Sequence, residues 1–243
     1  MHPDLKDLLQ DLLHGAWSPF FWAGLTLGLY ALARVINGWR RRWWSSPLLL
    51  AWLGCLAAGL LLQASYQEYL SGTGWLSMLI GPATMAFAVP IYDQRHLIRR
   101  HWPVLLLGIA AGSTIAASSA WALADLLALP ADLTHTLETH SITTPFAMAV
   151  SEKIGGVPQL AAIATAITGL VGAVIGEVLL ATMKLRSSFA RGAMFGMGAH
   201  SVGVAKAHEL GSEEGSVASL VMVLAGLANI LLAPMILAFA QAL

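Results

Sequence analysis

The chain has 243 residues, of which 57% are hydrophobic and only 11% are charged, and its formal net charge is zero. Soluble domains carry about 25% charged residues, so this composition excludes an ordinary soluble protein and predicts an all-α integral membrane protein in contact with the lipid bilayer. A chain without net positive charge is also not expected to bind nucleic acid.

Residues 1–15 have an amphipathic pattern. Their leucines recur at the spacing of one helical face, at Leu5, Leu8, Leu9, Leu12 and Leu13. The stretch is acidic and has no basic region before its apolar residues, so it does not resemble a cleaved signal peptide. We expect a short helix that lies in the membrane interface.

Six apolar segments are long enough to cross a bilayer, which takes about 20 residues. We expect spans at 16–36, 47–64, 75–92, 103–128, 157–183 and 214–241. The first two are expected to form a scaffold region over 16–64, beside a transport-like core over 65–243. Two other segments, 134–156 and 188–210, are interrupted by Gly, Pro, His or hydroxyl residues and are predicted to be broken helices.

The basic residues constrain this layout, because cytoplasmic loops collect Lys and Arg. Ten of the thirteen follow the first, third and fifth spans: Arg34, Arg40, Arg41, Arg42, Arg95, Arg99, Arg100, Lys184, Arg186 and Arg191. They share one side only if 134–156 returns to the side from which it came. We therefore expect 134–156 to be re-entrant from outside, 188–210 to be re-entrant from the cytoplasm, and both termini to lie outside. Such inverted pairs are the layout of many secondary transporters.

The first broken segment contains SITTPFAMAV, which begins at Ser141. Pro145 is expected at the first helical position, where its missing N–H costs nothing, with Thr143 or Thr144 as the cap. The amides of Phe146 and the two residues after it would then be free and, with the three hydroxyls, would bind a carboxylate. The alternative is a capped helix that only turns the chain.

The second broken segment contains GMGAHSVG (196–203). Gly198 and Gly203 permit close backbone approach or a broken helix. His200 is ionisable, and such a side chain at membrane depth is a functional candidate that exchanges a proton near neutral pH. With Ser201 it is expected to approach the substrate from the other side. The alternative is a histidine hydrogen-bonded between packed helices.

Two polar residues lie inside the later spans. Glu177 either couples a proton to transport or pairs with Lys184 or Arg186 near the interface. Asn229 donates a hydrogen bond either to a substrate or to a neighbouring helix. The sequence contains no metal-ligand cluster, Walker loop, nucleophile elbow or dinucleotide fingerprint, so we expect no enzymatic activity, cofactor or bound metal.

Five strings resemble, in this order, those of the LrgB/CidB family: GPATMAFAVPIYDQ (81–94), SITTPFAMAVSEKIGGVPQLAA (141–162), TGLVGAVIGEVLL (168–180), ARGAMFGMGAHSVGVAKAHEL (190–210) and EGSVASLVMVLAGL (214–227). The resemblance runs over about residues 47–237. The family commonly reads SHGIGTA or SHALGTA where this chain reads AHSVGVA. No role of the two replaced hydroxyls carries over to Ala199 and Val204, whereas His200 and Gly203 are retained.

The resemblance implies a multi-pass protein of the bacterial inner membrane, but its functional implication is divided. Bacterial members are described as antiholin-like or holin-like regulators of murein hydrolase activity and lysis, beside a small LrgA/CidA-type membrane partner. The plant plastid relative is a glycolate/glycerate translocator, and some bacterial relatives are linked to pyruvate uptake. The hydroxyls, helix termini and histidine of the two broken segments favour transport.

We therefore expect a secondary transporter of small monocarboxylates, of the pyruvate, lactate and glycolate class, that works by alternating access. Proton coupling would involve His200 or Glu177. A homodimer is expected, because the first two spans resemble a scaffold beside a glycine-rich remainder. The lysis regulator is the alternative.

Overall fold

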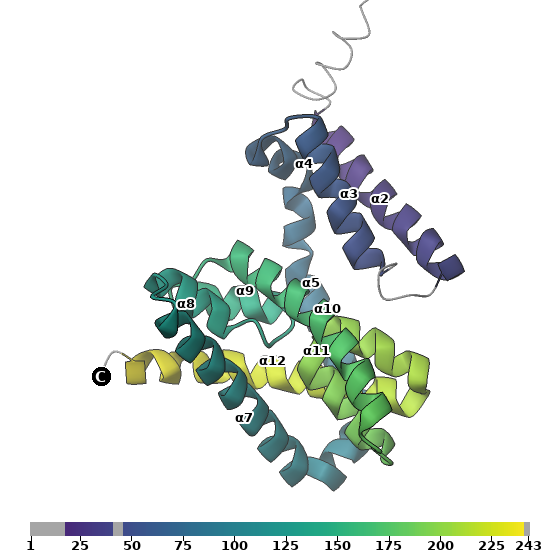
Figure 1. Ribbon diagram of the computed structural model, residues 1–243, viewed down its shortest axis with the longest axis vertical. Helices are drawn as coiled ribbons and strands as arrows, with labels where there is room; N and C mark the ends of the chain where they lie inside the picture. Colours follow the sequence, from purple (N-terminus) through teal and green to yellow (C-terminus); the bar gives the residue numbers. More distant parts are fainter. Residues whose placement is uncertain (1–17, 41–45, 241–243) are drawn as a thin grey trace, which may run out of the picture. The chain divides into compact units, whose positions relative to one another are not determined.

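The computed structural model describes residues 18–40 and 46–240, and every regular element within them is a helix (Figure 1). The expected interfacial helix at 1–15 lies outside these residues, as do Arg41 and Arg42 of the charge pattern. The described residues group into two compact units that divide between Ala83 and Thr84.

The first unit contains α2 (Ser18–Arg40), α3 (Pro47–Leu61) and α4 (Tyr66–Met78), and α2 packs against both of the others. Trp22 of α2 is fully buried, and its ring stands edge-on to Tyr69 of α4 with 5.7 Å between the centroids. Gly72 permits the close crossing of these two helices, because a Cβ there would lie only 2.5 Å from the carbonyl oxygen of Pro19.

The expected span at 75–92 is not a single helix. The chain forms the end of α4, then α5 (Ile80–Met85) and α6 (Ala88–Asp93), with interruptions at Leu79 and at residues 86–87. Prolines explain the breaks, because a proline inside a helix lacks the N–H for the carbonyl four residues earlier and its ring clashes with that carbonyl. Pro82 and Pro90 have this effect on the carbonyls of Met78 and Ala86.

Four helices of the described residues are long and apolar enough to cross a membrane: α2, α7 (Arg95–Leu126), α10 (Pro158–Thr182) and α12 (Ser212–Ala240). The apolar α3 has 15 residues and is shorter than a typical span. The structure therefore supports four of the six expected spans, since 47–64 is short and 75–92 is divided. α7 begins before the expected residue 103 and is kinked at His101, two residues before Pro103.

Helix α12 connects the two parts of the second unit that contain the broken segments (Figure 1). Its first half packs on α11 (Ser188–Leu210), where a Cβ on Gly196 would overlap the carbonyl oxygen of Ala218. Its second half packs on α9 (Thr144–Lys153), where a Cβ on Gly226 would overlap the ring of Phe146. The absence of a side chain at these glycines thus allows a close backbone contact in the first case and the seating of the Phe146 ring on α12 in the second.

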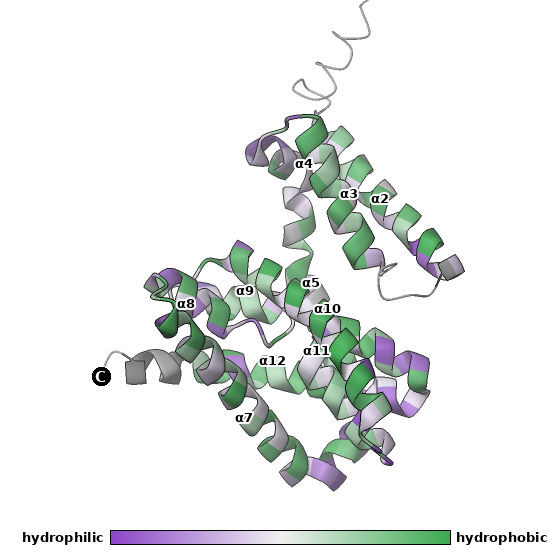
Figure 2. Cartoon of the chain, in the orientation of Figure 1, coloured by the Kyte–Doolittle hydropathy of each residue, from purple (hydrophilic) through white to green (hydrophobic). Residues whose placement is uncertain are grey.

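Apolar side chains also cover the outside of the second unit. Figure 2 shows long hydrophobic stretches along α7, α10 and α12. On α10 the exposed residues include Ile163, Ile167, Val171, Ile175 and Val178. A continuous apolar exterior on long helices is what a bilayer accommodates, so the chain is a membrane protein.

Candidate functional site

The first broken segment starts and ends at the same place in the second unit. α8 (Ala131–Glu138) follows α7, and residues 139–143 then lead without helix into α9. After α9 the chain returns to α8, because the Val157 N–H donates to Thr136 Oγ1 over 2.7 Å. Thr136 Oγ1 also donates to the carbonyl of Asp132 over 2.6 Å. The buried Thr136 hydroxyl therefore joins the two ends of the segment.

The start of α9 differs from the expected anion site. Thr143 is the capping residue, but its side chain makes no cap hydrogen bond, and Pro145 is the second helical residue rather than the first. The N–H groups of Phe146 and Ala147 both donate to the carbonyl of Thr143, over 2.9 and 3.0 Å. The prediction that these two amides are free is wrong, because the first turn closes on its own capping carbonyl.

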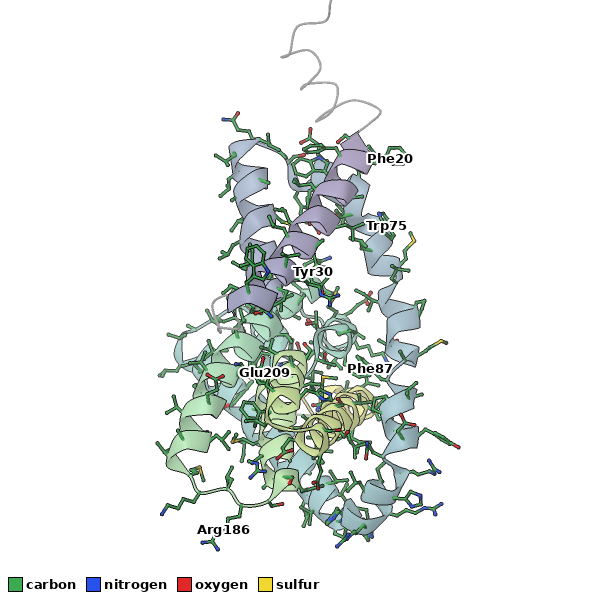
Figure 3. All side chains as sticks on the ribbon, turned by 90° about the vertical axis from the view of Figure 1, so that its right-hand side faces the viewer. Phe20, Tyr30, Trp75, Phe87, Arg186 and Glu209 are labelled. Carbon is green, nitrogen blue, oxygen red and sulfur yellow. The ribbon has the colours of Figure 1, made fainter. Side chains whose placement is uncertain are left out.

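Phe146 serves as a core residue at this helix start. It is buried and packs with Ile142 and Ala147. Its ring also lies 5.5 Å, between centroids, from Phe87 in the turn before α6; Phe87 is labelled in Figure 3. The backbone N–H of Phe146 is therefore hydrogen-bonded, and its side chain is packed in the core.

The second broken segment doubles back on itself along α10. In the first half of α11, Phe195 lies beside Gly176, where a Cβ would be 2.7 Å from its ring. At the break, His200 lies beside Gly169, two turns nearer the start of α10. After the break, Lys206 is again at the level of Phe195, because its Nζ lies 2.6 Å from Glu177.

The break in α11 falls on a histidine rather than on a glycine. His200 has φ 46° and ψ −127°, a backbone region that glycine occupies readily and that costs other residues about 1–3 kcal/mol. The side chain is 3% exposed, and neither ring nitrogen has a hydrogen-bond partner among the described residues. Strain and unpaired polar atoms thus coincide at one buried residue.

The two broken segments meet at this histidine. The backbone of Ser141 in the first segment lies close enough to the His200 ring to act as a hydrogen-bond acceptor, although the pair does not meet the geometry of a full hydrogen bond. The imidazole of His140 acts on the ring electrostatically. Nδ1 of His200 also lies 3.8 Å from the position that a Cβ on Gly169 would take. The buried Ser141, the buried Thr143 and His200 therefore lie in one region beside α10.

Ion pairs hold the second broken segment near its start and near its end. Arg191 near the start of α11 pairs with the buried carboxylate of Glu214 in α12 and also donates to the Leu185 carbonyl. Glu177 pairs with Lys206, so the expectation of Lys184 or Arg186 as its partner is wrong. The sequence could not indicate this pair, because the turn at His200 creates it. Figure 3 labels Arg186, in the loop that precedes α11, and Glu209, the last residue but one of α11.

The remaining predicted site residues are not all brought together. Thr144 and Pro145 are partly buried at the start of α9, whereas Gly198 and Ser201 are exposed. Gly203 is buried against the carbonyl oxygen of Phe195 and has a packing role.

Asn229 also faces the protein rather than an open site. It donates to Ser113 of α7 and to the carbonyl of Ala225, each over 2.8 Å. Of its two sequence-based alternatives, the bond to a neighbouring helix is therefore the one observed.

Sequence reasoning also missed residues on the buried face of α10. Gly169, Gly172 and Gly176 form the surface on which α11 packs, and their spacing was the signal. Thr165 precedes them by one turn and carries a buried hydroxyl without a partner among the described residues. No three His, Cys, Asp or Glu side chains of the described chain gather as a metal site requires.

Comparison with known proteins gives a consistent family. A profile of the LrgB-like family matches residues 26–239. The chain is 36% identical over 215 residues to the uncharacterized protein YwbG of Bacillus subtilis (strain 168), covering 88% of this chain and 96% of YwbG. It is 31% identical to the uncharacterized protein YxaC of the same organism, covering 78% and 83%. It is 28% identical to the antiholin-like protein LrgB of Bacillus mycoides (strain KBAB4), covering 72% and 76%. No solved structure matches the chain.

Proposed function

The chain belongs to the LrgB-like family, and we propose that it is a secondary transporter of small monocarboxylates. Its substrate site lies where residues 139–143 and the break at His200 come together beside α10. The observation that carries the proposal is the buried imidazole of His200, which is held in a strained backbone and whose ring nitrogens make no hydrogen bond of full geometry within the described part of the chain.

Buried polar atoms in proteins nearly always have partners, so an unpaired one needs an explanation. Intramembrane ionisable residues face substrate or ion pathways more often than lipid. A neutral imidazole offers one donor and one acceptor, and a carboxylate would satisfy the donor. Strain at the same residue is typical of ligand sites, where the surrounding fold holds a costly conformation.

The paths of the two segments support a re-entrant arrangement. Each segment leaves a helix end, reaches the region of His200 and returns to its starting level, closed by Thr136–Val157 in one case and by Arg191–Glu214 in the other. Discontinuous helices that meet near mid-membrane place irregular backbone where it is buried in protein. Alternating access would expose this region first to one side and then to the other.

The carboxylate in this proposal is bound by side chains rather than by the amides after Pro145. Hydroxyls of Ser141, Thr143 and Thr144 would approach it from the first segment, and His200 from the second. His140 acts electrostatically on His200, so both imidazoles belong to the proposed site. Proton coupling, if present, would therefore involve these imidazoles before Glu177, which pairs with Lys206.

An antiholin-like regulator of lysis is the second candidate, favoured by the printed name of the Bacillus mycoides relative. In that case the chain would act with a small LrgA/CidA-type membrane partner, and His200 would be a packing residue. This candidate predicts lysis phenotypes that are insensitive to carboxylates. It also predicts that purified protein does not move carboxylates across a membrane.

Purified protein in liposomes distinguishes the two candidates. Uptake of labelled pyruvate, lactate and glycolate is measured with and without a pH gradient, for wild type, Thr144→Val, His200→Ala and the control Ser118→Ala. The Ser118 hydroxyl is exposed and donates to its own helix, so the control should behave as wild type. Loss of one hydrogen bond to a charged ligand should raise KM about tenfold. Saturable flux that either test variant impairs supports transport, and the absence of flux contradicts it.

A further inference from the structure

The buried face of α10 links the two broken segments through one threonine. Ala161, Thr165 and Gly169 are all buried and follow one another at intervals of four residues, which places them on one face of the helix. Ala161 packs in the cluster that contains Ile142 and Phe146 of the first segment. Gly169 lies against His200 of the second segment. Thr165 therefore lies on α10 one helical turn from Ala161, which contacts the first segment, and one turn from Gly169, which contacts the second.

The buried hydroxyl of Thr165 has no partner among the described residues, a property it shares with Ser151 of α9 and Ser18 at the start of α2 but not with four other helical threonines. A threonine in a helix can donate to the carbonyl three or four residues earlier. Thr26, Thr73, Thr136 and Thr182 do this. Thr165 is 3% exposed, and its Oγ1 has no hydrogen-bond partner among the described residues.

We propose that Thr165 is a substrate-binding residue of the same site, and that its hydroxyl donates to the carboxylate held by His200. Its position beside both segments and its unpaired buried donor carry the assignment. Four residues of helix rise about 6 Å, so Thr165 lies one turn from Gly169, the α10 residue that faces the His200 ring. The proposal rests on the transport function, because the ligand is the transported acid.

Three variants on α10 test this assignment. Thr165→Val keeps the shape of the side chain but removes the hydroxyl, and Thr165→Ser keeps the hydroxyl. Thr182→Val is the control, because Thr182 is exposed on the same helix and its hydroxyl donates to Val178. The readouts are KM for pyruvate in liposomes, the affinity for pyruvate from thermal shifts in detergent, and Tm without ligand.

Thr165→Val should raise KM and weaken pyruvate binding about tenfold or more, as expected for a lost hydrogen bond to a charged group. Thr165→Ser and Thr182→Val should stay near wild type. The Tm of ligand-free Thr165→Val should be equal or higher, because a buried unpaired hydroxyl has been replaced by a methyl group. A purely structural hydroxyl would give the opposite result, a lower Tm with unchanged KM, and would overturn the assignment.

The outcomes also separate this assignment from the transport proposal. If wild type transports pyruvate and Thr165→Val does so with unchanged KM, only the role of Thr165 is refuted. If wild type binds pyruvate without transporting it, the affinity of Thr165→Val still decides the assignment. If wild type neither transports nor binds pyruvate, lactate or glycolate, both proposals are refuted.

Discussion

Lys206 Nζ lies 2.6 Å from Glu177 Oε1, which brings the end of α11 back alongside the part of α10 that its first half contacts. Glu177 is 44% exposed, so the pair should contribute at most about 1 kcal/mol. A double-mutant cycle with Glu177→Gln and Lys206→Met, read by Tm in detergent, should give a small coupling energy. Glu177→Gln should also keep the response of uptake to a pH gradient. Loss of that response would assign proton coupling to Glu177 instead.

Gly172 should not tolerate a side chain. A Cβ there would overlap the carbonyl oxygen of Gly198, and a backbone atom cannot move aside as a flexible side chain can. Gly172→Ala should therefore destabilise the protein by about 1–3 kcal/mol. Gly108→Ala on α7 is the control, because nothing lies within 4 Å of its added Cβ, and alanine should be neutral or stabilising there. Equal Tm values for the two variants would contradict the close α10–α11 contact.

His200→Gly should be more stable than His200→Ala. The backbone of His200 has φ 46° and ψ −127°, which only glycine adopts without strain, so the difference should be about 1–3 kcal/mol. Tm and denaturant midpoints in detergent measure it. If alanine is as stable as glycine at this position, the turn in α11 is not strained as described.

Thr136→Val should loosen the first broken segment. The hydroxyl accepts from the Val157 N–H and is buried, so its removal leaves an amide unpaired at a cost of about 1–3 kcal/mol. Thr134→Val is the matched control, because the Thr134 hydroxyl donates to Pro130 at the surface of the same helix. Hydrogen exchange at residues 139–157 should rise in Thr136→Val alone. Unchanged exchange would mean that another contact closes the segment.

The sequence predicted the long helices well because their signal is local. Length and hydropathy alone mark α2, α7, α10 and α12. They failed at 75–92, where Pro82 and Pro90 divide an apolar stretch into short helices. The mean hydropathy of a window does not show where a proline interrupts the helical hydrogen bonds of the backbone.

The candidate site was less predictable, because it depends on where the chain turns. The glycines around His200 indicated a broken helix, but not that the break would fall on the histidine itself. The free amides after Pro145 were wrongly expected, since Thr143 supplies its own carbonyl to them. Thr165 gave no signal, because a single threonine in an apolar helix usually bonds to its own backbone.

His200→Gly removes the imidazole that is proposed to bind the transported carboxylate, and glycine also fits the strained backbone at this position. The measurement is the initial rate of labelled pyruvate uptake into liposomes, at matched protein content, for wild type and His200→Gly. Wild type should show saturable uptake, and His200→Gly should be well folded but take up pyruvate at least about tenfold more slowly. Equal uptake by the two proteins, or no uptake of pyruvate, lactate or glycolate by wild type, would contradict this role of His200.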